Sequence, residues 1–160
     1  LMDRQLAQLV DYKMNNGLPR NLTGSSHERL PLNHGFKAVQ IGVSAWTAEA
    51  LKQTLSASIF SRSTECHNQD KVSMGTIAAR DASRVIVLTE QVLAALSCAC
   101  VQAVKLKGLD TELTPVLTAF QQWVLQSFKY VEEDRPLQQE LQTLVDRFEN
   151  LELFSSTIFA

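Results

Sequence analysis

A dense run of polar side chains lies near the middle of the chain, between Glu65 and Gly75. Its first part, Glu65-Cys66-His67-Asn68-Gln69-Asp70-Lys71, combines acids, amides, an imidazole and a cation. Turns are usually built from short clusters of Gly, Pro, Asn, Asp or Ser, so this run is more polar than a turn requires. A helix-compatible segment follows from about Met74, and the free N–H groups and dipole of a helix start favour negative charge. The sequence therefore predicts a place that holds an anionic group of a substrate.

Other kinds of chemistry fit this run less well. Cys66 and His67 are adjacent, and no second Cys–His pair lies nearby to complete a metal site. Neighbouring side chains in an extended segment point apart, which also disfavours a Cys–His nucleophile pair. The six glycines are scattered and form no phosphate-binding loop. A simpler alternative stays open, in which Asn68, Gln69 and Asp70 only cap the following helix and hold the loop together.

The composition excludes several classes of function. A net charge of −2 and a pI of about 5.9 give no electrostatic footprint for nucleic acid or an anionic membrane. Polar residues interrupt the chain too often for a transmembrane span, and Asp3, Gln5 and Gln8 break any apolar stretch of a signal peptide. The three cysteines are an odd count, typical of reduced, buried thiols. We therefore expect a cytoplasmic protein that binds neither nucleic acid nor membrane, and no metal site.

The elements that would position the polar run are all helices. Apolar residues recur every three or four positions, and no segment alternates as a strand does. The predicted helices cover residues 2–15, 36–54, 72–105, 114–130 and 134 to about 148 or 153. Gly17 and Pro19 end the first helix, and Pro115 begins the fourth. The 160 residues therefore predict a single all-α domain, a bundle built around one long helix.

The segment 72–105 is the dominant helix. It would be on the order of 50 Å long at 1.5 Å per residue. Its apolar residues cover a wide surface, and a helix of this kind needs partners on most sides. The rest of the chain is too short to supply all of them. We therefore expect the apolar face of residues 76–104 to meet other chains or a missing part of this one.

Five blocks of sequence, in the same order, resemble the aromatic amino acid ammonia-lyases and aminomutases. The blocks are Asp3-Arg4-Gln5-Leu6-Ala7, Gly17-Leu18-Pro19 with Asn21-Leu22, Asn33-His34-Gly35-Phe36-Lys37, Asn68-Gln69-Asp70, and Val72-Ser73-Met74-Gly75 with Ala78-Ala79-Arg80. They are similar to consecutive segments in the second half of bacterial phenylalanine and tyrosine ammonia-lyases, and the match fades after about Gly108. The resemblance implies the C-terminal part of the aspartase/ammonia-lyase-like helical fold, and a homotetramer when the protein is full length.

The resemblance also implies a reaction and a cofactor. The family eliminates ammonia from an aromatic amino acid to give an aryl acrylate, using a 4-methylidene-imidazol-5-one (MIO) ring formed from an internal Ala-Ser-Gly and a tyrosine base. This chain contains no Ala-Ser-Gly, and Leu1-Met2-Asp3 reads as the middle of a longer protein. We therefore expect a missing N-terminal portion to supply the ring and the base. No catalytic residue is expected within residues 1–160, and the fragment alone should be inactive.

Position by position, the resemblance assigns substrate-binding roles to Lys37, Ile41, Glu65, Asn68 and Gln69. Lys37 and Glu65 resemble a pair beside the substrate amino group, which would need one another if buried. Asn68 resembles a residue that helps to hold the carboxylate, and Gln69 resembles the adjacent polar wall. Ile41 resembles an apolar contact for the aromatic ring, and its i+4 spacing places it on the face of Lys37. Without the resemblance, Lys37 reads equally well as a surface lysine, and Ile41 alone reads as a core residue.

Lys37 and Gln69 also bear on the choice of substrate. Histidine-specific relatives tend to carry a methionine and an acid at these two positions. An acid can accept a proton or pair with imidazole, whereas an amide cannot. L-Phenylalanine or L-tyrosine is therefore expected as the substrate rather than L-histidine. Two alternatives stay open: a fragment of an aromatic amino acid 2,3-aminomutase, which shares these pocket residues, and a non-catalytic helical interaction domain derived from the family.

Overall fold

The computed structural model describes residues 1–149, which form five α-helices and four short 3-10 helices and contain no strand. The α-helices are α1 (Met2–Val10), α2 (Lys37–Lys52), α3 (Gly75–Lys107), α4 (Pro115–Leu125) and α5 (Gln138–Glu149). The 3-10 helices are η1 (Arg20–Leu22), η2 (Leu30–Leu32), η3 (Ala57–Phe60) and η4 (Glu65–His67). The all-α prediction is confirmed, and each of the five predicted helices is present.

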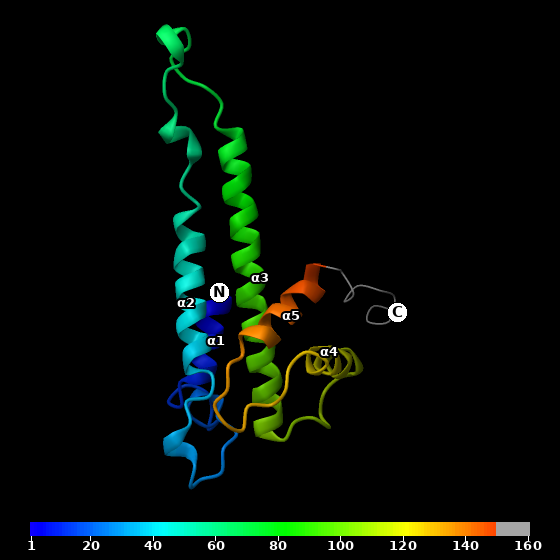
Figure 1. The fold of residues 1–160 in the computed structure, drawn as a ribbon. Coiled ribbons are helices and arrows are strands. Elements are labelled where there is room, and N and C mark those ends of the chain that lie inside the picture. The colour runs from blue at the N-terminus through cyan, green and yellow to red at the C-terminus, as the bar shows by residue number, and fades with distance from the viewer. Residues whose placement is uncertain (150–160) are drawn as a thin grey trace.

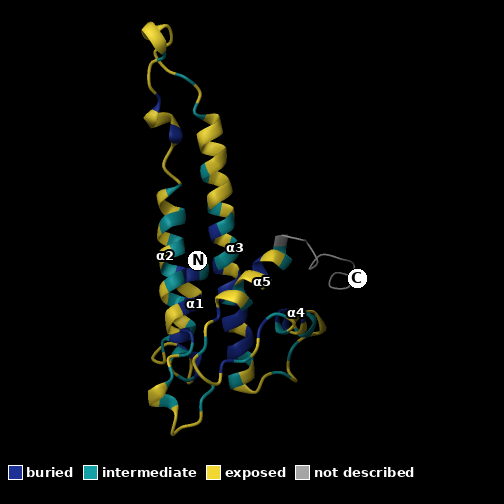
Figure 2. Ribbon diagram, in the orientation of Figure 1, coloured by how far each residue is buried: buried dark blue, intermediate teal, exposed yellow. Residues whose placement is uncertain are grey.

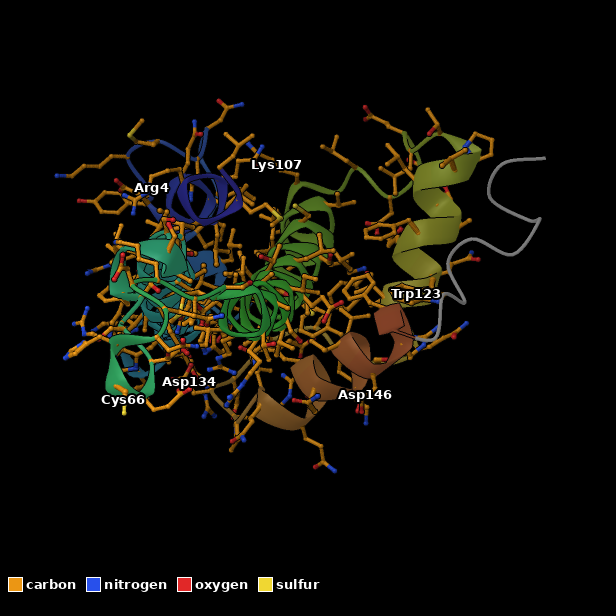
Figure 3. The ribbon with its side chains drawn as sticks, turned by 90° about the horizontal axis from the view of Figure 1, so that it is seen from above. Arg4, Cys66, Lys107, Trp123, Asp134 and Asp146 are labelled. Carbon is orange, nitrogen blue, oxygen red and sulfur yellow. The ribbon has the colours of Figure 1, made fainter. Side chains whose placement is uncertain are left out.

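The long axis of the molecule is a hairpin made of α2 and α3, joined by residues 53–74 at its far end (Figure 1). Viewed along α3, helices α1 and α2 lie on one side of it, and α4 and α5 lie on the other (Figure 3). The polar run around η4 occupies the tip of the hairpin, and the first turn of α2 lies at the opposite end.

Helix ends differ from the sequence-based boundaries for local reasons. Helix α1 stops at Val10, because Asp11 is extended and the following turn places Asn16 and Gly17 at φ values of 55° and 80°. Helix α4 ends at Leu125 rather than at residue 130, and the chain then turns inward to bury Phe128. The alternative end of the last helix at Leu153 lies outside the described residues, as do the final residues 155–160.

The core surrounds the C-terminal half of α3, where Ala95, Cys98 and Ala99 are fully buried. Helices α1, α2 and α5 and the segment after α4 pack against it through large apolar side chains, including Leu6, Val43, Leu144 and Phe128. The N-terminal half of α3 is mostly exposed (Figure 2), and Ile86 on it is 58% exposed. Part of the apolar surface of α3 is therefore uncovered by the described residues, as the sequence predicted.

Helix α3 is also long and apolar enough, by length and composition alone, to cross a membrane. The sequence-based argument that polar residues interrupt the chain too often does not hold for this helix. Half of its most apolar window of 18 residues is buried inside the fold, as is usual for the central helix of a bundle.

Candidate functional site

Lys37 is the first residue of α2 and lines a groove of about 410 Å³. The groove lies between the loops that contain η1 and η2. Its lining residues are Pro19, Arg20, Asn21, Thr23, Leu30, Pro31, Asn33, His34 and Lys37. Within residues 1–149, neither Arg20 nor Lys37 takes part in an ion pair. The groove is therefore basic, and the described part of the chain offers these two side chains no acidic partner.

The wall of this groove depends on unusual backbone geometry. Asn21 and Leu22 both lie in the left-handed region, with φ values of 54° and 55°. The Phe36 N–H donates to the Asn21 carbonyl at 2.8 Å, which draws the two loops together. Gly35, at φ 50°, fits beneath them, and a Cβ atom at this position would lie 2.5 Å from the Asn21 oxygen. Only glycine satisfies both conditions, which explains the glycine in the Asn33-His34-Gly35 block.

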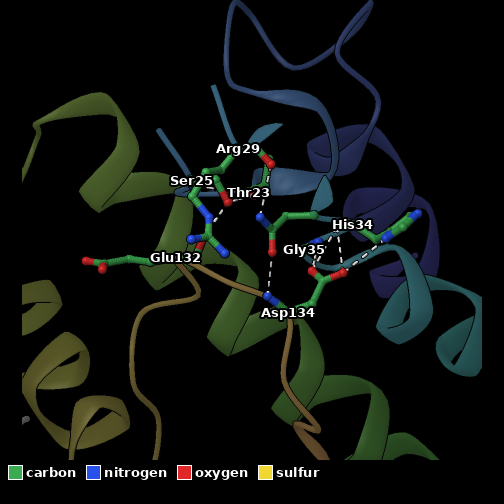
Figure 4. A network of polar contacts seen from close by, with 8 residues as sticks. Thr23, Ser25, Arg29, His34, Gly35, Glu132 and Asp134 are labelled. Carbon is green, nitrogen blue, oxygen red and sulfur yellow. Dashed lines mark hydrogen bonds and ion pairs between the residues drawn. The ribbon is translucent and has the colours of Figure 1, made fainter. Parts of the chain in front are cut away.

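Asp134, about 100 residues further along the chain, binds the same turn (Figure 4). We call its hydrogen bonds with His34 and Gly35 the clasp. The Asp134 carboxylate accepts hydrogen bonds from the His34 and Gly35 N–H groups at 2.8 and 2.9 Å, and its Oδ2 lies 3.0 Å from Nδ1 of His34. The Asp134 N–H donates to Oδ1 of Asn33 at 2.8 Å. Burial acts to raise the pKa of Asp134, but the hydrogen bonds from His34 and Gly35 outweigh it and hold the pKa below its usual value.

The residues of the polar run close the hairpin tip through their backbone. Cys66 and His67 adopt φ values of 51° and 55°, and the Asn68 N–H donates to the Glu65 carbonyl at 3.0 Å. The Gln69 N–H donates to Oγ1 of Thr64, and the Thr64 N–H donates to the Gln69 carbonyl, both at 3.0 Å. The side chains at positions 65, 68 and 69 are all exposed. These three side chains are exposed at the end of the hairpin, and the hydrogen bonds that hold the tip together come from the backbone and from Thr64.

The alternative in which Asn68, Gln69 and Asp70 cap the following helix is wrong. The N-cap of α3 is Met74, with no side-chain cap, and the first N–H of the helix donates to Oγ of Ser73 at 3.2 Å. Asp70 precedes the helix by five residues. The helix begins at Gly75, as expected from about Met74, so the run of residues 65–75 does lead into a helix N-terminus, but Glu65, Asn68 and Gln69 precede that terminus by six or more residues.

The structure brings the five predicted substrate-binding residues together in two separate groups. Lys37 and Ile41 are both exposed on the first turns of α2, and Ile41 is 59% exposed rather than a core residue. Glu65, Asn68 and Gln69 lie together at the tip. From Lys37 to Lys52, α2 alone spans about 22 Å at 1.5 Å per residue, and the connector extends further in the same direction (Figure 1). Lys37 and Glu65 therefore do not meet within one chain, and the predicted pocket is incomplete in it.

The cysteines have different environments. Cys98 is buried, which raises the pKa of its thiol to about 12, whereas Cys66 and Cys100 are exposed, contrary to the expectation of buried thiols. All three are free. Among the described residues, no group of three or more His, Cys, Asp or Glu side chains could hold a metal ion.

Residues 1–126 match the family described as aromatic amino acid lyase. The chain belongs to the aromatic amino acid lyase family. Among its relatives, a tyrosine ammonia-lyase of Cereibacter sphaeroides is 40% identical over 149 residues, covering 90% of this chain and 27% of that protein. A histidine ammonia-lyase of Fusobacterium nucleatum is 30% identical and covers 84% of this chain and 25% of its own length. An MIO-dependent tyrosine 2,3-aminomutase of Streptomyces globisporus is 31% identical over 91% of this chain and 26% of its own.

The fold of this aromatic amino acid lyase chain also matches solved structures. The tyrosine aminomutase from Streptomyces globisporus superposes with a TM-score of 0.87 at 29% identity, over 95% of this chain and 28% of that one. This agreement confirms the helical aspartase/ammonia-lyase-like fold. The chain spans about a quarter of the length of the curated relatives it matches.

Sequence reasoning missed Asp134. The sequence predicts a helix start at residue 134, whereas α5 begins at Gln138, and nothing in the sequence pairs Asp134 with His34. It also lies beyond the region that matches the family, which ends at residue 126.

Proposed function

We propose that this chain is the C-terminal part of an aromatic amino acid ammonia-lyase that prefers L-phenylalanine or L-tyrosine to L-histidine. The observation that carries this proposal is the display of two complementary sets of side chains. Lys37 has no acidic partner within residues 1–149 and lies in a basic groove, and the acid and amides at positions 65, 68 and 69 are exposed at the hairpin tip. In a member of this family, both sets are suited to bind an amino acid.

The complete pocket would form between copies of the chain. Lys37 and Glu65 lie at opposite ends of one chain, so a second copy has to bring its tip to the groove of the first. Pairing would then neutralise two charges that are costly to bury separately. The exposed apolar face on the N-terminal half of α3 is available for the same assembly, which we propose to be a homotetramer in the full-length protein.

Within such a pocket, the residues of this chain would bind and orient the substrate. Lys37 and Glu65 would lie beside the amino group, Asn68 would donate to the carboxylate, and Ile41 would contact the aromatic ring. Residues 1–160 contain no Ala-Ser-Gly, so this chain cannot itself form the MIO ring. A preceding N-terminal portion would supply that electrophile, which activates the substrate for loss of ammonia. The fragment alone would therefore be inactive, in a protein that we place in the cytoplasm.

The preference for substrate has a direct test. In a full-length enzyme that contains this chain, kcat/KM for L-phenylalanine or L-tyrosine should exceed that for L-histidine. Formation of cinnamate, coumarate and urocanate can be followed by absorbance. Gln69→Glu should shift the ratio toward L-histidine, because an acid can pair with imidazole. A higher kcat/KM for L-histidine in the unmodified enzyme would contradict the proposal.

A second candidate is an aromatic amino acid 2,3-aminomutase. It is favoured by the similarity in fold and sequence to the tyrosine aminomutase of Streptomyces globisporus. Product analysis separates the two, since an aminomutase returns the amino group to the carbon chain and accumulates a β-amino acid, whereas a lyase releases an aryl acrylate and ammonia.

A further inference from the structure

The connection between α4 and α5 contains a strap, residues 129–135, which is folded around one arginine. Nε of Arg135 donates to Oε1 of Glu140 at 2.9 Å, and Nη2 donates to Oε2 at 3.0 Å. The same guanidinium donates to the carbonyls of Tyr130 and Lys129 at 3.2 and 2.6 Å. A planar guanidinium with this many fixed acceptors holds the backbone in one conformation.

The strap is also fixed to the core beneath the groove. Gln102 on α3 is 1% exposed, and its amide donates to the carbonyls of Leu22 and Val131, both at 2.9 Å. Its oxygen accepts from the Val131 N–H at 3.0 Å, and the Gly24 N–H donates to the Val131 carbonyl at 2.9 Å. The loop that forms one wall of the groove and the strap are therefore tied to the same buried side chain.

With the strap held by Gln102 and Arg135, the Asp134 carboxylate lies against the turn that precedes α2. Helix α2 has Phe36 as its N-cap, with no side-chain cap of its own. The hydrogen bonds from the His34 and Gly35 N–H groups to Asp134 lie just before this N-cap, and they fix the backbone three and two residues before Lys37. Because α2 begins at Lys37, the orientation of this turn sets the direction in which the lysine enters the groove.

We propose that Asp134 is a positioning residue that holds Lys37 in the groove. The proposal rests on the proposed function, because the role of Lys37 toward the substrate is itself proposed. Asp134 does not line the groove and would not touch the substrate. It acts through the backbone of the turn at His34 and Gly35.

The first test measures the clasp in the chain of 160 residues. Asp134→Asn should speed amide hydrogen exchange at His34 and Gly35 by about tenfold, since charge-assisted hydrogen bonds are lost. It should also change the NMR signals of Lys37. Glu132→Gln is the matched control, because it removes the same charge two residues away and its side chain points away from the clasp (Figure 4). Exchange at core amides of α3 reports whether the variant remains folded.

The second test asks whether the clasp acts through Lys37. In a full-length enzyme, Asp134→Asn should lower kcat/KM by about tenfold when Lys37 is present, and by less than about twofold in a Lys37→Met background. A merely structural role would give the same loss in both backgrounds.

The outcomes separate this inference from the proposed function. Unchanged exchange at His34 and Gly35 in a folded Asp134→Asn variant, or an unchanged Lys37 signal, overturns the inference whether or not the enzyme is active. Additive losses with Lys37→Met overturn it as well. A full-length enzyme that turns over no aromatic amino acid overturns the proposed function, while the exchange measurement still decides the clasp.

Discussion

Gly35 shows how strongly the groove depends on single residues. The turn before α2 needs a left-handed backbone at the point where the Asn21 carbonyl passes closest, and a side chain would collide with that oxygen. The strain at Asn21 and Leu22 is stabilised by the Phe36 N–H and by Gln102 below. The residue types of the Asn33-His34-Gly35 block are therefore explained by packing at the start of α2.

Replacing Gly35 tests this packing. Gly35→Ala should destabilise the fold by about 2 to 4 kcal/mol, because it adds a steric clash to an unfavourable φ. Gly108→Ala is the matched control. Gly108 has φ 68° but no atom within 4 Å of the added Cβ, so its cost should be only about 1 kcal/mol of backbone strain. Urea unfolding measures both, and equal losses would contradict the proposed contact.

The Asp134 clasp predicts that the free energy of unfolding depends on pH in the acid range. The pKa of Asp134 is lower in the folded chain than its ordinary value of 3.8, so its contribution to stability is present above that value. It is lost as the pH falls below 3.8 and through the folded pKa. Asp134→Asn should therefore reduce stability at neutral pH and flatten the decline in acid. His34 is the titratable side chain that faces the carboxylate directly. Parallel acid unfolding curves for variant and parent would contradict this account.

At the scale of elements, periodicity was enough to predict the helices but not the segments between them. The apolar repeat placed α2 and α3 correctly to within a few residues, because burial on one face dictates that spacing. The strap could not be predicted, since it is held by hydrogen bonds rather than by an apolar pattern, and the contact between Asp134 and His34 joins residues 100 positions apart. By contrast, the separation of Lys37 and Glu65 follows from the predicted helix over residues 36–54, which begins next to Lys37, ends before Glu65 and rises about 1.5 Å per residue.

Two glutamines on α3 provide a matched test of how the strap is held. Gln102→Leu should destabilise the fold by about 2 to 4 kcal/mol, because the buried Leu22 carbonyl and Val131 N–H lose their partner and the Val131 carbonyl keeps only the Gly24 N–H. Gln91→Leu should change stability by less than about 0.5 kcal/mol or stabilise the fold, because Oε1 of Gln91 is buried without a hydrogen bond. Thermal or urea unfolding of both variants gives the comparison. Similar losses of unfolding free energy in the two variants would contradict the claim that the hydrogen bonds of Gln102 stabilise the fold.

At the scale of the whole molecule, the chain is a well-packed base with a long hairpin extending from it. The base contains the core, the groove and the strap, whereas the upper half of the hairpin leaves apolar side chains exposed (Figure 2). Such a shape is suited to lay the hairpin against other copies and to carry the tip away from its own groove. We therefore propose that the substrate pocket joins the groove of one copy to the tip of another.

Mixing two inactive variants tests that claim most directly. Full-length Lys37→Met and Glu65→Ala enzymes should each lose most of their activity toward an aromatic amino acid. Co-assembled from equal amounts, they should recover activity, because up to about one quarter of randomly formed sites would combine an intact groove with an intact tip. Recovery well above the sum of the two separate variants is the predicted result. No recovery, in mixed assemblies confirmed by mass, would contradict a pocket shared between copies.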